Sequence, residues 1–527
     1  GRLRSWRTTV INEMVFGGPL VASFSFRQVV TALTCIASLA AAALYGVHPV
    51  LSLLVVLGTA SYIMRLRMPA PDAVRLELPD IDFGLDRPTE EKMCIIGLGY
   101  VGLGIAGALK RNGVPFDVLE ADSDVGGNWF HGVYETVHII SSRKTTEYSD
   151  FPMPDNWPDF PSAAQMHRYL CAYADHFQLR RHTQFRCVVE SCVPVGDGSA
   201  WQVSYTNVQG AKQTNTYKGV VVCIGHHWDP RMPSYPGQSH FTGQFMHSKA
   251  YKTAEQVKDR RVLVIGGGNS ACDIAVEAAR FGTSSHLSVR RGYWIVPRTI
   301  MGYPSLELMP WYLPFWLVVK IVKLTLFLVV GDYRKYGLPK PDHEPFQHHP
   351  TINSELLNNI RLGNIIPHGD IAEFSGGNTV TFKDGRREDF DLVVAATGFH
   401  MSIPMLKDLV KYKDDVPQLV GGLFLPNYRN LYISIGGQVR YGAGPVITAG
   451  AANLVRALEV QERCRRPLGR ILQKMGAPMM RKSRKSQDVL IDPFVAFRQA
   501  FIGRHFISWL PSMEKILFYF EKPRNRK

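Results

Sequence analysis

The first feature of the hydrophobic pattern is a long apolar run near the start of the chain. From Val29 to Met64 there are 36 residues without an Asp, Glu, Lys or Arg. A membrane-spanning helix needs about 20 such residues, so the run predicts one tilted span or two short ones broken near Pro49. Arginines flank the run on both sides, which favours a hairpin with both ends cytoplasmic. We therefore expect residues 1–68 to anchor the chain to a membrane, and a hairpin buried in a protein core is the alternative.

Beyond this region the pattern changes to short apolar runs that end in glycine turns. A proline-rich linker of mixed charge covers 69–91. Runs at 93–96 and 262–265 each lead through a glycine-rich loop into a helical pattern, and further runs fall at 220–227 and 392–400. Buried parallel strands have this appearance, because both faces of such a sheet are covered. The alternation of strand and helix therefore predicts an α/β fold.

The loop after the first run has the glycine spacing of a dinucleotide site. The motif Gly-x-Gly-x-x-Gly places Gly97, Gly99 and Gly102 between a strand and a helix. Such glycines let the backbone approach a pyrophosphate, whose charge is favourable at a helix N-terminus. Glu120 closes the next strand, at the place where a carboxylate binds a ribose hydroxyl. These four residues predict the first nucleotide site.

A second loop of this kind follows the run at 262–265. Its expected cofactor-binding residues are Gly266, Gly268, Asn269, Ser270 and Ala271, with Ala271 in the place of the third glycine. Arg290 and Arg291 stand at the end of the next strand instead of a carboxylate, which suits the 2′-phosphate of NADP. An arginine pair on a solvated loop is the alternative. Two dinucleotide sites in one chain predict hydride transfer from NADPH to a flavin.

Together these patterns predict two Rossmann-like domains in a glutathione-reductase-like arrangement, with the NADP domain inserted in a discontinuous FAD domain. The expected divisions are a membrane segment at 1–68, a linker at 69–91, the FAD domain at 92–228 and 399–470, the NADP domain at 229–398 with an apolar insertion at 293–350, and a basic amphipathic tail at 471–527. Within the insertion, the apolar stretch 311–330 contains Lys320 and Lys323. It predicts either a helix lying in a membrane interface or one covering the core.

Charge and cysteine content narrow the choice of partners. The formal net charge of +15 suggests nucleic acid, anionic lipid or a phosphate-bearing cofactor as the anionic partner. The basic residues are spread along the chain and no recognition module is present, so nucleic acid is not expected. The eight cysteines include no Cys-x-x-Cys pair, which predicts free, buried thiols in a reducing compartment and no metal site.

Further motifs support one family resemblance. They are "GGNW" at 126–129, "SDFPMP" at 149–154, "ATGF" at 396–399 and "FTGQFMHSKAY" at 241–251. In the last, Phe241, Gly243, His247 and Tyr251 match the fingerprint Phe-x-Gly-x-x-x-His-x-x-x-Tyr/Phe. Over residues 93–456 the chain resembles the class B flavoprotein monooxygenases, most closely the flavin-containing monooxygenases, including the bacterial and plant auxin-synthesis-like branch.

The resemblance implies an FAD- and NADPH-dependent monooxygenase. It would form a C4a-peroxyflavin and oxygenate a soft nucleophile, an amine or sulfur, or a lipophilic carbonyl compound. The expected partners are therefore molecular oxygen and a lipophilic small molecule, while the substrate's identity and the oligomeric state stay open. The resemblance adds Gly127, Asn128 and Trp129 to the FAD site. The stretch 241–251 lies between the strand that closes the first flavin section and the strand that opens the NADP domain, so we expect His247 to hold the two cofactor domains in register instead of donating a proton.

One position departs from the family pattern. Members that oxidise amines usually have an Asn shortly before the "DFP" motif, and here that position falls on Ile140 or Ser141, depending on the alignment. Ser141, Ser142 or His138 could replace the missing amide. We therefore predict Ser141, as the replacement, and His247, as the fingerprint residue, to be the catalytic residues. Without the amide, a membrane-associated NADPH oxidase or reductase that oxygenates no substrate is the alternative function. A non-catalytic nucleotide-binding membrane protein would leave the fingerprint unexplained.

Overall fold

The computed structural model describes residues 82–196, 198–309, 315–435, 438–439, 442–480, 490–491 and 506–518. The chain divides into two compact units, Gly1–Leu78 with Ser149–Pro152 and Pro79–Tyr148 with Met153–Lys527. The sheets and the site described below belong to the second unit. The predicted membrane hairpin at 1–68 lies outside the described residues. Among the helices that are described, none is both long and apolar enough to cross a bilayer.

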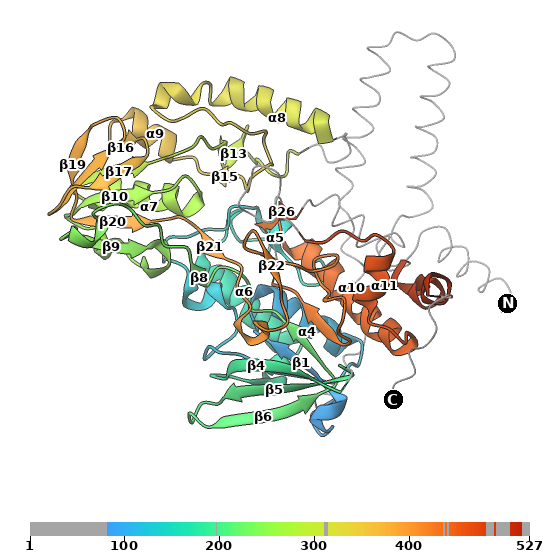
Figure 1. Ribbon diagram of the computed structural model, residues 1–527. Coiled ribbons are helices and arrows are strands. Elements are labelled where there is room, and N and C mark those ends of the chain that lie inside the picture. The colour runs from blue at the N-terminus through green and yellow to red at the C-terminus, as the bar shows by residue number, and fades with distance from the viewer. Residues whose placement is uncertain are drawn as a thin grey trace, which may run out of the picture. The chain divides into compact units, whose positions relative to one another are not determined.

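The first sheet has five parallel strands in the order β24–β7–β1–β2–β3, and its strand β1 is labelled in Figure 1. They are β1 (Met93–Ile96), β2 (Phe116–Leu119), β3 (Thr183–Gln184), β7 (Gly219–Val222) and β24 (Leu431–Ile433). The central strands β1, β2 and β7 are buried along their whole length, which explains their continuous apolar sequence. Because β24 pairs with β7, two stretches of chain far apart in sequence build this one sheet.

Helices and a small antiparallel sheet cover the faces of the first sheet. The helices are α4 (Tyr100–Arg111), α6 (Ala163–His176) and α10 (Gly444–Arg463). The antiparallel strands β4 (Val188–Val195), β5 (Ala200–Thr206) and β6 (Lys212–Tyr217) form the small sheet. Its fully buried Trp201 belongs to one apolar cluster with Ile96 and Val220 of the parallel sheet. This packing fixes the strand ends from which the first glycine loop starts.

The second parallel sheet has the order β16–β11–β10–β20–β9. Its strands are β9 (Gln244–His247), β10 (Arg261–Ile265), β11 (Ser284–Ser288), β16 (Ile365–His368) and β20 (Leu392–Ala395). Helix α7 (Asn269–Phe281) follows β10, and an antiparallel sheet of β17 (Ile371–Phe374), β18 (Thr379–Phe382) and β19 (Arg387–Asp389) lies beyond β16 in sequence. The two parallel sheets confirm the predicted α/β class.

A short strand pairing lies where the chain passes between the two sheets. Strand β8 (Asp229–Pro230) pairs antiparallel with β21 (Phe399–His400), so the incoming and outgoing segments lie side by side. The predicted domain limits at 228/229 and 398/399 fall at this pairing, and they stay predictions. The limit at 470/471 falls inside helix α11 (Leu468–Lys474), because the apolar Leu468, Ile471 and Leu472 form its buried face.

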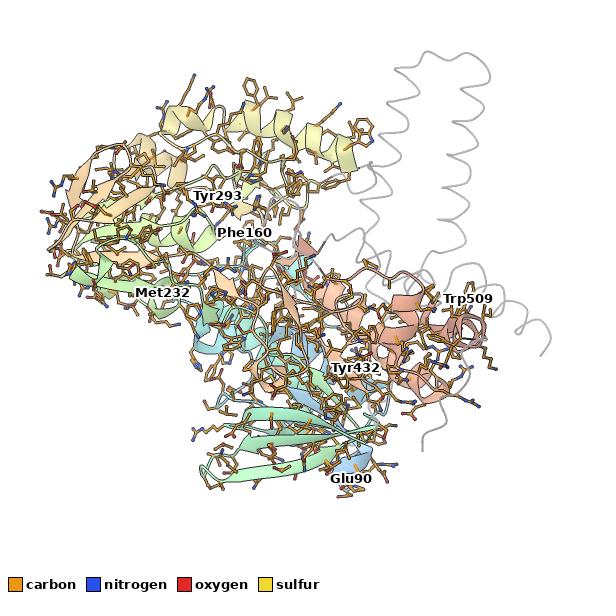
Figure 2. The ribbon with its side chains drawn as sticks, viewed as in Figure 1. Glu90, Phe160, Met232, Tyr293, Tyr432 and Trp509 are labelled. Carbon is orange, nitrogen blue, oxygen red and sulfur yellow. The ribbon has the colours of Figure 1, made fainter. Side chains whose placement is uncertain are left out.

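The apolar insertion contains a helix with two different faces. Helix α8 (Phe315–Val329) buries Val318, Val319 and Leu326, while its other side exposes large apolar side chains. Trp316, Leu324, Phe327 and Leu328 have exposed fractions of 61%, 59%, 68% and 72%. Figure 2 shows the side chains projecting outward from this helix. The segment therefore covers a core cluster on one side, as one of its two predicted alternatives required, and presents an apolar surface on the other.

Short elements complete the fold. They are α5 (Arg143–Thr146), α9 (Leu356–Arg361), β12 (Ile295–Val296), β13 (Thr299–Ile300), β14 (Tyr303–Pro304), β15 (Thr351–Ile352), β22 (Tyr412–Lys413), β23 (Val416–Pro417), β25 (Gln438–Val439), β26 (Leu490–Ile491) and the turns η1 to η8. A further helix spans 506–517 in the predicted tail, and it buries Leu510 while Trp509 is 67% exposed (Figure 2).

Candidate active site

One large cavity of about 2360 Å³ is lined by both glycine loops. From the first loop region it takes Gly97, Gly99, Glu120, Gly127, Asn128 and Trp129, and from the second Gly266, Gly268, Asn269, Ser270, Arg290 and Arg291. Pockets for one small ligand usually measure about 300–1,000 Å³, so this cavity has room for more than one molecule. Two of the predicted cofactor-binding residues, Gly102 and Ala271, do not line the cavity, and both lie buried in the first turn of a helix.

The first loop is shaped by glycines that no other residue could replace. Gly97 has φ +95°, and a Cβ atom there would lie 2.8 Å from the carbonyl oxygen of Cys223. A Cβ atom on Gly102 would lie 2.1 Å from the carbonyl oxygen of Gly97. Helix α4 can therefore start directly against β1, with no acidic residue in its first turn. Its N-terminal N–H groups are left for an anion, as a dinucleotide pyrophosphate requires.

Glu120 lies at the predicted place, beside this loop. Its carboxylate accepts N–H hydrogen bonds from Leu98 and, at 2.9 Å, from Asp122. Burial raises the pKa of Glu120, and the two N–H donors oppose that shift. A carboxylate held this way keeps lone pairs for further donors, such as the hydroxyls of a ribose.

The "GGNW" motif lies against the first glycine loop. Gly126 has φ +115° and Gly127 has φ +54°, and a bridge pairs Gly99 with Gly126. A Cβ atom on Gly127 would lie 3.1 Å from the Cα of Gly99. Asn128 and Trp129 follow in η2 (Asn128–Gly132), a turn of π-helix on the cavity wall. The structure thus brings together residues that the family resemblance alone had associated.

The second loop repeats this close packing. Gly266 has φ +135°, and a Cβ atom there would lie 2.5 Å from the carbonyl oxygen of Ala396 and 3.5 Å from the Cβ of Ala271. Asn269 lines the cavity, and its side chain also binds the backbone of a neighbouring segment. Its amide donates to the Pro350 carbonyl at 3.1 Å and accepts the Ile352 N–H at 2.7 Å, so it holds β15 against the loop.

The two arginines after β11 both reach the cavity. Arg291 stacks on Tyr293, with its guanidinium carbon 5.3 Å from the ring centroid, and donates to the Tyr293 hydroxyl at 3.3 Å. Arg290 is exposed, and no hydrogen bond or ion pair joins its guanidinium to another residue in the described part of the chain. Its five N–H donors are therefore available to a phosphate.

His247 is buried behind the cavity wall and does not line it. Its Nδ1 accepts the Lys249 N–H at 3.1 Å, so the proton belongs on Nε2, which donates to the Gly398 carbonyl at 3.0 Å. Burial lowers the pKa of His247. Tyr251 is also fully buried and donates to Glu277 of α7 at 2.6 Å. The fingerprint thus joins β9 to the "ATGF" loop and to helix α7.

The candidate replacements for the missing amide lie in different surroundings. Ser141 lines the cavity, but its hydroxyl is paired with Thr146 Oγ1 at 2.8 Å. Ile140 and His138 line the cavity as well. Ser142 is buried and pairs with Thr145 at 3.2 Å, away from the cavity wall. Of the three candidates, Ser141 and His138 are the two within reach of a bound molecule.

Four of the cavity-wall histidines that were missed from the sequence form two adjacent pairs in the chain. They are His226, His227, His348 and His349, which come from two segments about 120 residues apart. The rings of His226 and His227 lie 4.0 Å apart. Burial and the neighbouring His226 lower the pKa of His227, and the same causes lower that of His349 to about 4. Because no sequence spacing links these segments, only the fold brings the four histidines to one wall, where the lowered pKa values keep His227 and His349 neutral at pH 7.

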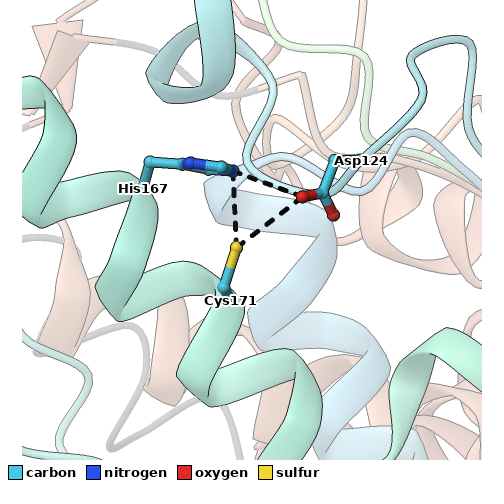
Figure 3. A group of neighbouring side chains, drawn as sticks. All are labelled: Asp124, His167 and Cys171. Carbon is cyan, nitrogen blue, oxygen red and sulfur yellow. Dashed lines mark hydrogen bonds and ion pairs between the residues drawn. The ribbon is translucent and has the colours of Figure 1, made fainter.

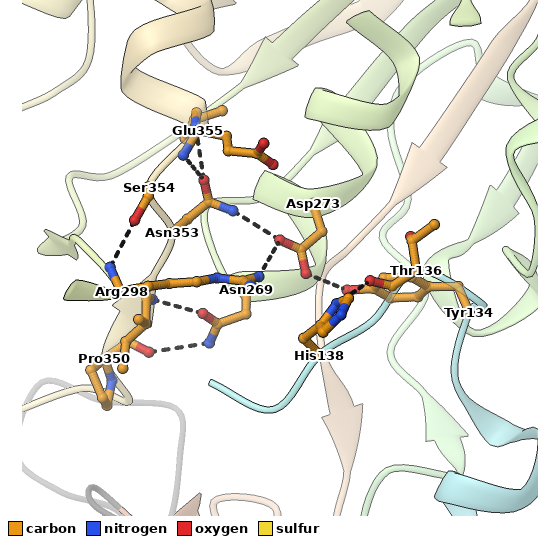
Figure 4. A network of polar contacts seen from close by, with 12 residues as sticks. Tyr134, Thr136, His138, Asn269, Asp273, Arg298, Pro350, Asn353, Ser354 and Glu355 are labelled. Carbon is orange, nitrogen blue, oxygen red and sulfur yellow. Dashed lines mark hydrogen bonds and ion pairs between the residues drawn. The ribbon is translucent and has the colours of Figure 1, made fainter. Parts of the chain in front are cut away.

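A buried polar network joins three parts of the chain near the cavity (Figure 4). The Tyr134 hydroxyl donates to Asp273 of α7 at 2.8 Å, and the Asn353 amide donates to the other Asp273 oxygen at 2.8 Å. Arg298 of the insertion lies 3.7 Å from the same carboxylate. Tyr134 follows the "GGNW" segment, so the network ties the first loop region, the second loop's helix and the insertion together.

Each parallel sheet leads into a nucleotide-binding glycine loop, and both loops line one cavity. This arrangement defines a flavoprotein oxidoreductase with two dinucleotide sites. Comparison with known proteins narrows this class. A family model described as flavin-binding monooxygenase-like matches residues 90–517. The chain is 33% identical to human flavin-containing monooxygenase 5 over 375 residues, covering 67% of this chain and 70% of that protein. It is 29% identical to human flavin-containing monooxygenase 3, covering 80% of this chain and 84% of that protein.

Solved structures show the same fold. The OTEMO protein, solved with FAD and NADP, matches with a TM-score of 0.58 at 19% identity, over 71% of this chain and 85% of that chain. A flavin-containing monooxygenase from Stenotrophomonas maltophilia matches with a TM-score of 0.53 at 20% identity, over 70% of this chain and 98% of that chain.

The family model and the human relatives show that the chain belongs to the flavin-binding monooxygenase-like family. It is an NADPH-dependent flavin monooxygenase that oxygenates a heteroatom or a carbonyl compound, with FAD and NADPH as cofactors. Its assignment to the plant auxin-synthesis-like branch stays a prediction.

Proposed function

We propose that FAD lies along the loop from Gly97 to Trp129 and NADPH along the loop from Gly266 to Arg291, in one shared cavity. The observation that supports this most is that both loops line the same cavity. The residues present fit the two groups: each loop starts a helix whose first turn contains no acid, Glu120 offers a carboxylate to a ribose, and Arg290 offers a cation to a 2′-phosphate. Bound FAD supplies hydride acceptance and, once reduced, oxygen activation.

The protein's own residues have orienting and shielding roles in this proposal. His247 fixes the "ATGF" loop through Gly398, and the Tyr134–Asp273–Asn353 network fixes α7. Ser141, His227 and His349 offer hydrogen bonds without a charge. Excluding water strengthens such polar contacts, so the site acts by positioning two cofactors and a substrate and needs no acid–base pair.

The substrate we propose is a lipophilic compound with a soft nucleophilic atom, such as a sulfide or amine, or a lipophilic ketone. Most of the cavity surface is apolar, and the cavity reaches Leu306 of the insertion and Phe506 and Ile507 of the C-terminal helix. Charged side chains outside the two nucleotide loops also line it, among them Arg231, Lys249 and Asp415, so the lipophilic molecule would lie against the apolar part of the wall. A lipophilic molecule has few polar groups that would lose hydrogen bonds to water on entering this cavity, and burying its apolar surface is favourable.

We further propose that the exposed face of α8 rests on a membrane surface, with the catalytic part on the cytoplasmic side. Seven exposed apolar side chains line this helix, and Lys320 lies 5.2 Å from the Trp316 ring centroid. Apolar side chains flanked by cations are typical of helices that lie in the interface of an anionic bilayer. The N-terminal apolar run would add a second attachment, as its sequence predicts.

The experiment that tests the cofactor proposal is anaerobic reduction of the purified protein. The protein should be yellow, contain one FAD per chain, and bleach when NADPH is added without oxygen. Its Gly266→Ala variant should keep FAD but bleach far more slowly, because the added Cβ would lie 2.5 Å from the Ala396 carbonyl and disturb only the NADPH loop. If the Gly266→Ala variant lost FAD and the NADPH response together, the two sites would not be assigned as proposed.

A further inference from the structure

Cys171 differs from the other thiols of the described residues. Those residues contain seven free cysteines, of which six are buried and Cys171 is partly exposed. It lies on α6 four residues after His167, so one helix face presents both side chains. Asp124 reaches them from the segment that leads into Gly126 and Gly127 (Figure 3). The sequence predicted no metal site, because the thiol and the carboxylate are 47 residues apart and no Cys-x-x-Cys signals them.

The three donor atoms have the spacing of a metal-ligand set. Cys171 Sγ lies 3.3 Å from His167 Nε2 and 3.9 Å from Asp124 Oδ2, and those two atoms are 3.7 Å apart. The point in their plane that is equally far from the three donors is about 2.1 Å from each, and a tetrahedral cation slightly above that plane is about 2.2 Å from each, which matches the bond lengths of Zn²⁺ to nitrogen, oxygen and sulfur within about 0.2 Å. We infer that Asp124, His167 and Cys171 bind a Zn²⁺-type cation, with water in the fourth position.

The surrounding charges and hydrogen bonds suit this assignment. Arg180 donates to Asp124, but to its Oδ1, which also accepts the Val125 N–H at 2.7 Å. The metal-facing Oδ2 accepts the Cys171 thiol at 3.9 Å and becomes available to the cation when that thiol loses its proton, and the carboxylate is already oriented, as ligating carboxylates usually are. Arg180 also donates to Asp175 at 2.8 Å. Two carboxylates and one thiolate against one guanidinium leave two negative charges, which a divalent cation neutralises.

The ligand types select the class of metal. A thiolate, an imidazole and a carboxylate together favour Zn²⁺ or a similar borderline-soft ion over Mg²⁺ or Ca²⁺, which prefer oxygen ligands. On binding, the Cys171 thiol loses its proton to solvent and the sulfur forms the metal bond. The side chains of His167 and Asp124 are 22% and 27% exposed, so the cation can reach the site from solvent. The bound ion would join α6 to the segment that leads into Gly126 and Gly127 of the "GGNW" motif.

The test is a metal titration of the tag-free, FAD-containing full chain after treatment with a chelator. Co²⁺ is added first, because its bond to a thiolate produces a sulfur charge-transfer band, which appears in the difference spectrum. Zn²⁺ is then added and should abolish the band with a stoichiometry of one per chain. Binding by the cavity histidines would give no sulfur band, so the spectrum separates the two locations.

Two ligand variants and two controls complete the test. Loss of an outer-shell partner alone costs about 10–100-fold in metal affinity, so Cys171→Ser and His167→Gln should each weaken Zn²⁺ binding at least about tenfold. Cys171→Ser should also lose the sulfur band, while Cys464→Ser and His240→Gln, which replace residues of the same kinds elsewhere, should bind as the parent does. Equal FAD content and melting temperature in chelator show that the variants fold. A missing sulfur band in the parent, or an unchanged band in Cys171→Ser, would overturn the inference.

Discussion

At the scale of single residues, the geometry of His247 explains what its fingerprint does. Both ring nitrogens are used within the protein, one by the Lys249 N–H and one by the Gly398 carbonyl. A group that is buried and paired on both sides has no proton to exchange with a ligand in the cavity. Its contribution must come through the loop that it holds.

We predict that His247→Ala impairs the coupling of NADPH oxidation to product formation more than it impairs FAD binding. The change removes the two hydrogen bonds that hold the backbone of Gly398 and Lys249, each worth about 0.5–1.5 kcal/mol, and so loosens the loop. Product, NADPH and hydrogen peroxide are measured together, and the product formed per NADPH should fall several-fold. His247→Gln keeps an N–H donor and should lose less. A flavin-free His247→Ala protein would instead place the residue in the FAD site.

Arg290 is the residue that should set the preference for NADPH over NADH. Charge-assisted hydrogen bonds to a phosphate contribute about 1.5–3 kcal/mol, so Arg290→Ala should raise the KM for NADPH by roughly ten- to a hundredfold. The KM for NADH, which lacks the 2′-phosphate, should change little. Arg361→Ala, on the surface of α9, is the matched control. Equal losses for both nucleotides would contradict the assignment.

The residues that sequence could identify are those whose neighbours lie close in the chain. Gly97 to Glu120 and Gly266 to Arg291 each belong to one continuous strand–helix–strand unit, so spacing alone locates them. The cavity histidines and the Asp124–His167–Cys171 cluster come from separate segments, and no local pattern connects them. The same reason explains Asn269: its place in the loop was predictable, but its partners Pro350 and Ile352 lie about 80 residues away.

At the scale of secondary-structure elements, the strands were easier to predict than the insertion. The strands beginning near 93, 220, 262 and 392 are short, apolar and stopped by glycine, and all four lie in parallel sheets. Helix α8 was ambiguous because its sequence is apolar on nearly every side. Only its tertiary contacts decide that Val318 and Leu326 face the core while Phe327 and Leu328 do not.

The exposed face of α8 should be the part of the described chain that contacts lipid. A lipid-borne photoreactive probe in anionic vesicles should label the peptide that contains 315–329. Replacing Leu324, Phe327 and Leu328 with Ser removes apolar area that stabilises interfacial binding, and labelling should fall several-fold. Replacing the exposed Val188 and Val193 of β4 is the control and should have no effect. Labelling that avoids α8 would refute this assignment.

At the scale of the whole molecule, stability should depend on a buried pair near the first sheet. Lys110 of α4 donates to His182 Nε2 at 3.0 Å, and both side chains are buried. Burial, and then the charge of Lys110, lower the pKa of His182 from 6.5 to about 4. The unfolded chain therefore binds this proton before the folded chain does, and folding stability from this site is lost as pH falls from about 6.5 to about 4.

We predict that the unfolding free energy of the protein decreases by up to about 1.4 kcal/mol per pH unit and per such histidine across this window. His182→Gln removes the titration and can keep both an acceptor for Lys110 and a donor for Phe116. Its stability should therefore fall less steeply on acidification, as measured by denaturant unfolding at several pH values. His240→Gln, which changes an exposed histidine, should keep the parent slope. A slope unchanged by His182→Gln would contradict the argument.

The architecture of the whole molecule was predictable because two glycine motifs repeat in one chain, and such a repeat implies two nucleotide domains. The pairing of β24 with β7 follows from this arrangement, since the chain must return to the first sheet after the second. The shared cavity could not be predicted, because it depends on how the two sheets face one another. That relation is fixed by distant contacts such as β8 with β21 and Tyr134 with Asp273.

The central claim is that this chain uses NADPH and FAD to place one oxygen atom on a lipophilic substrate. The most direct measurement is incorporation of labelled dioxygen with a lipophilic sulfide, amine or ketone, recorded together with NADPH consumed and hydrogen peroxide formed. We predict that the amount of product with one labelled oxygen atom equals the NADPH consumed minus the hydrogen peroxide formed. If all NADPH oxidation appeared as hydrogen peroxide, and no labelled product formed from any of the three substrate classes, the claim would be contradicted.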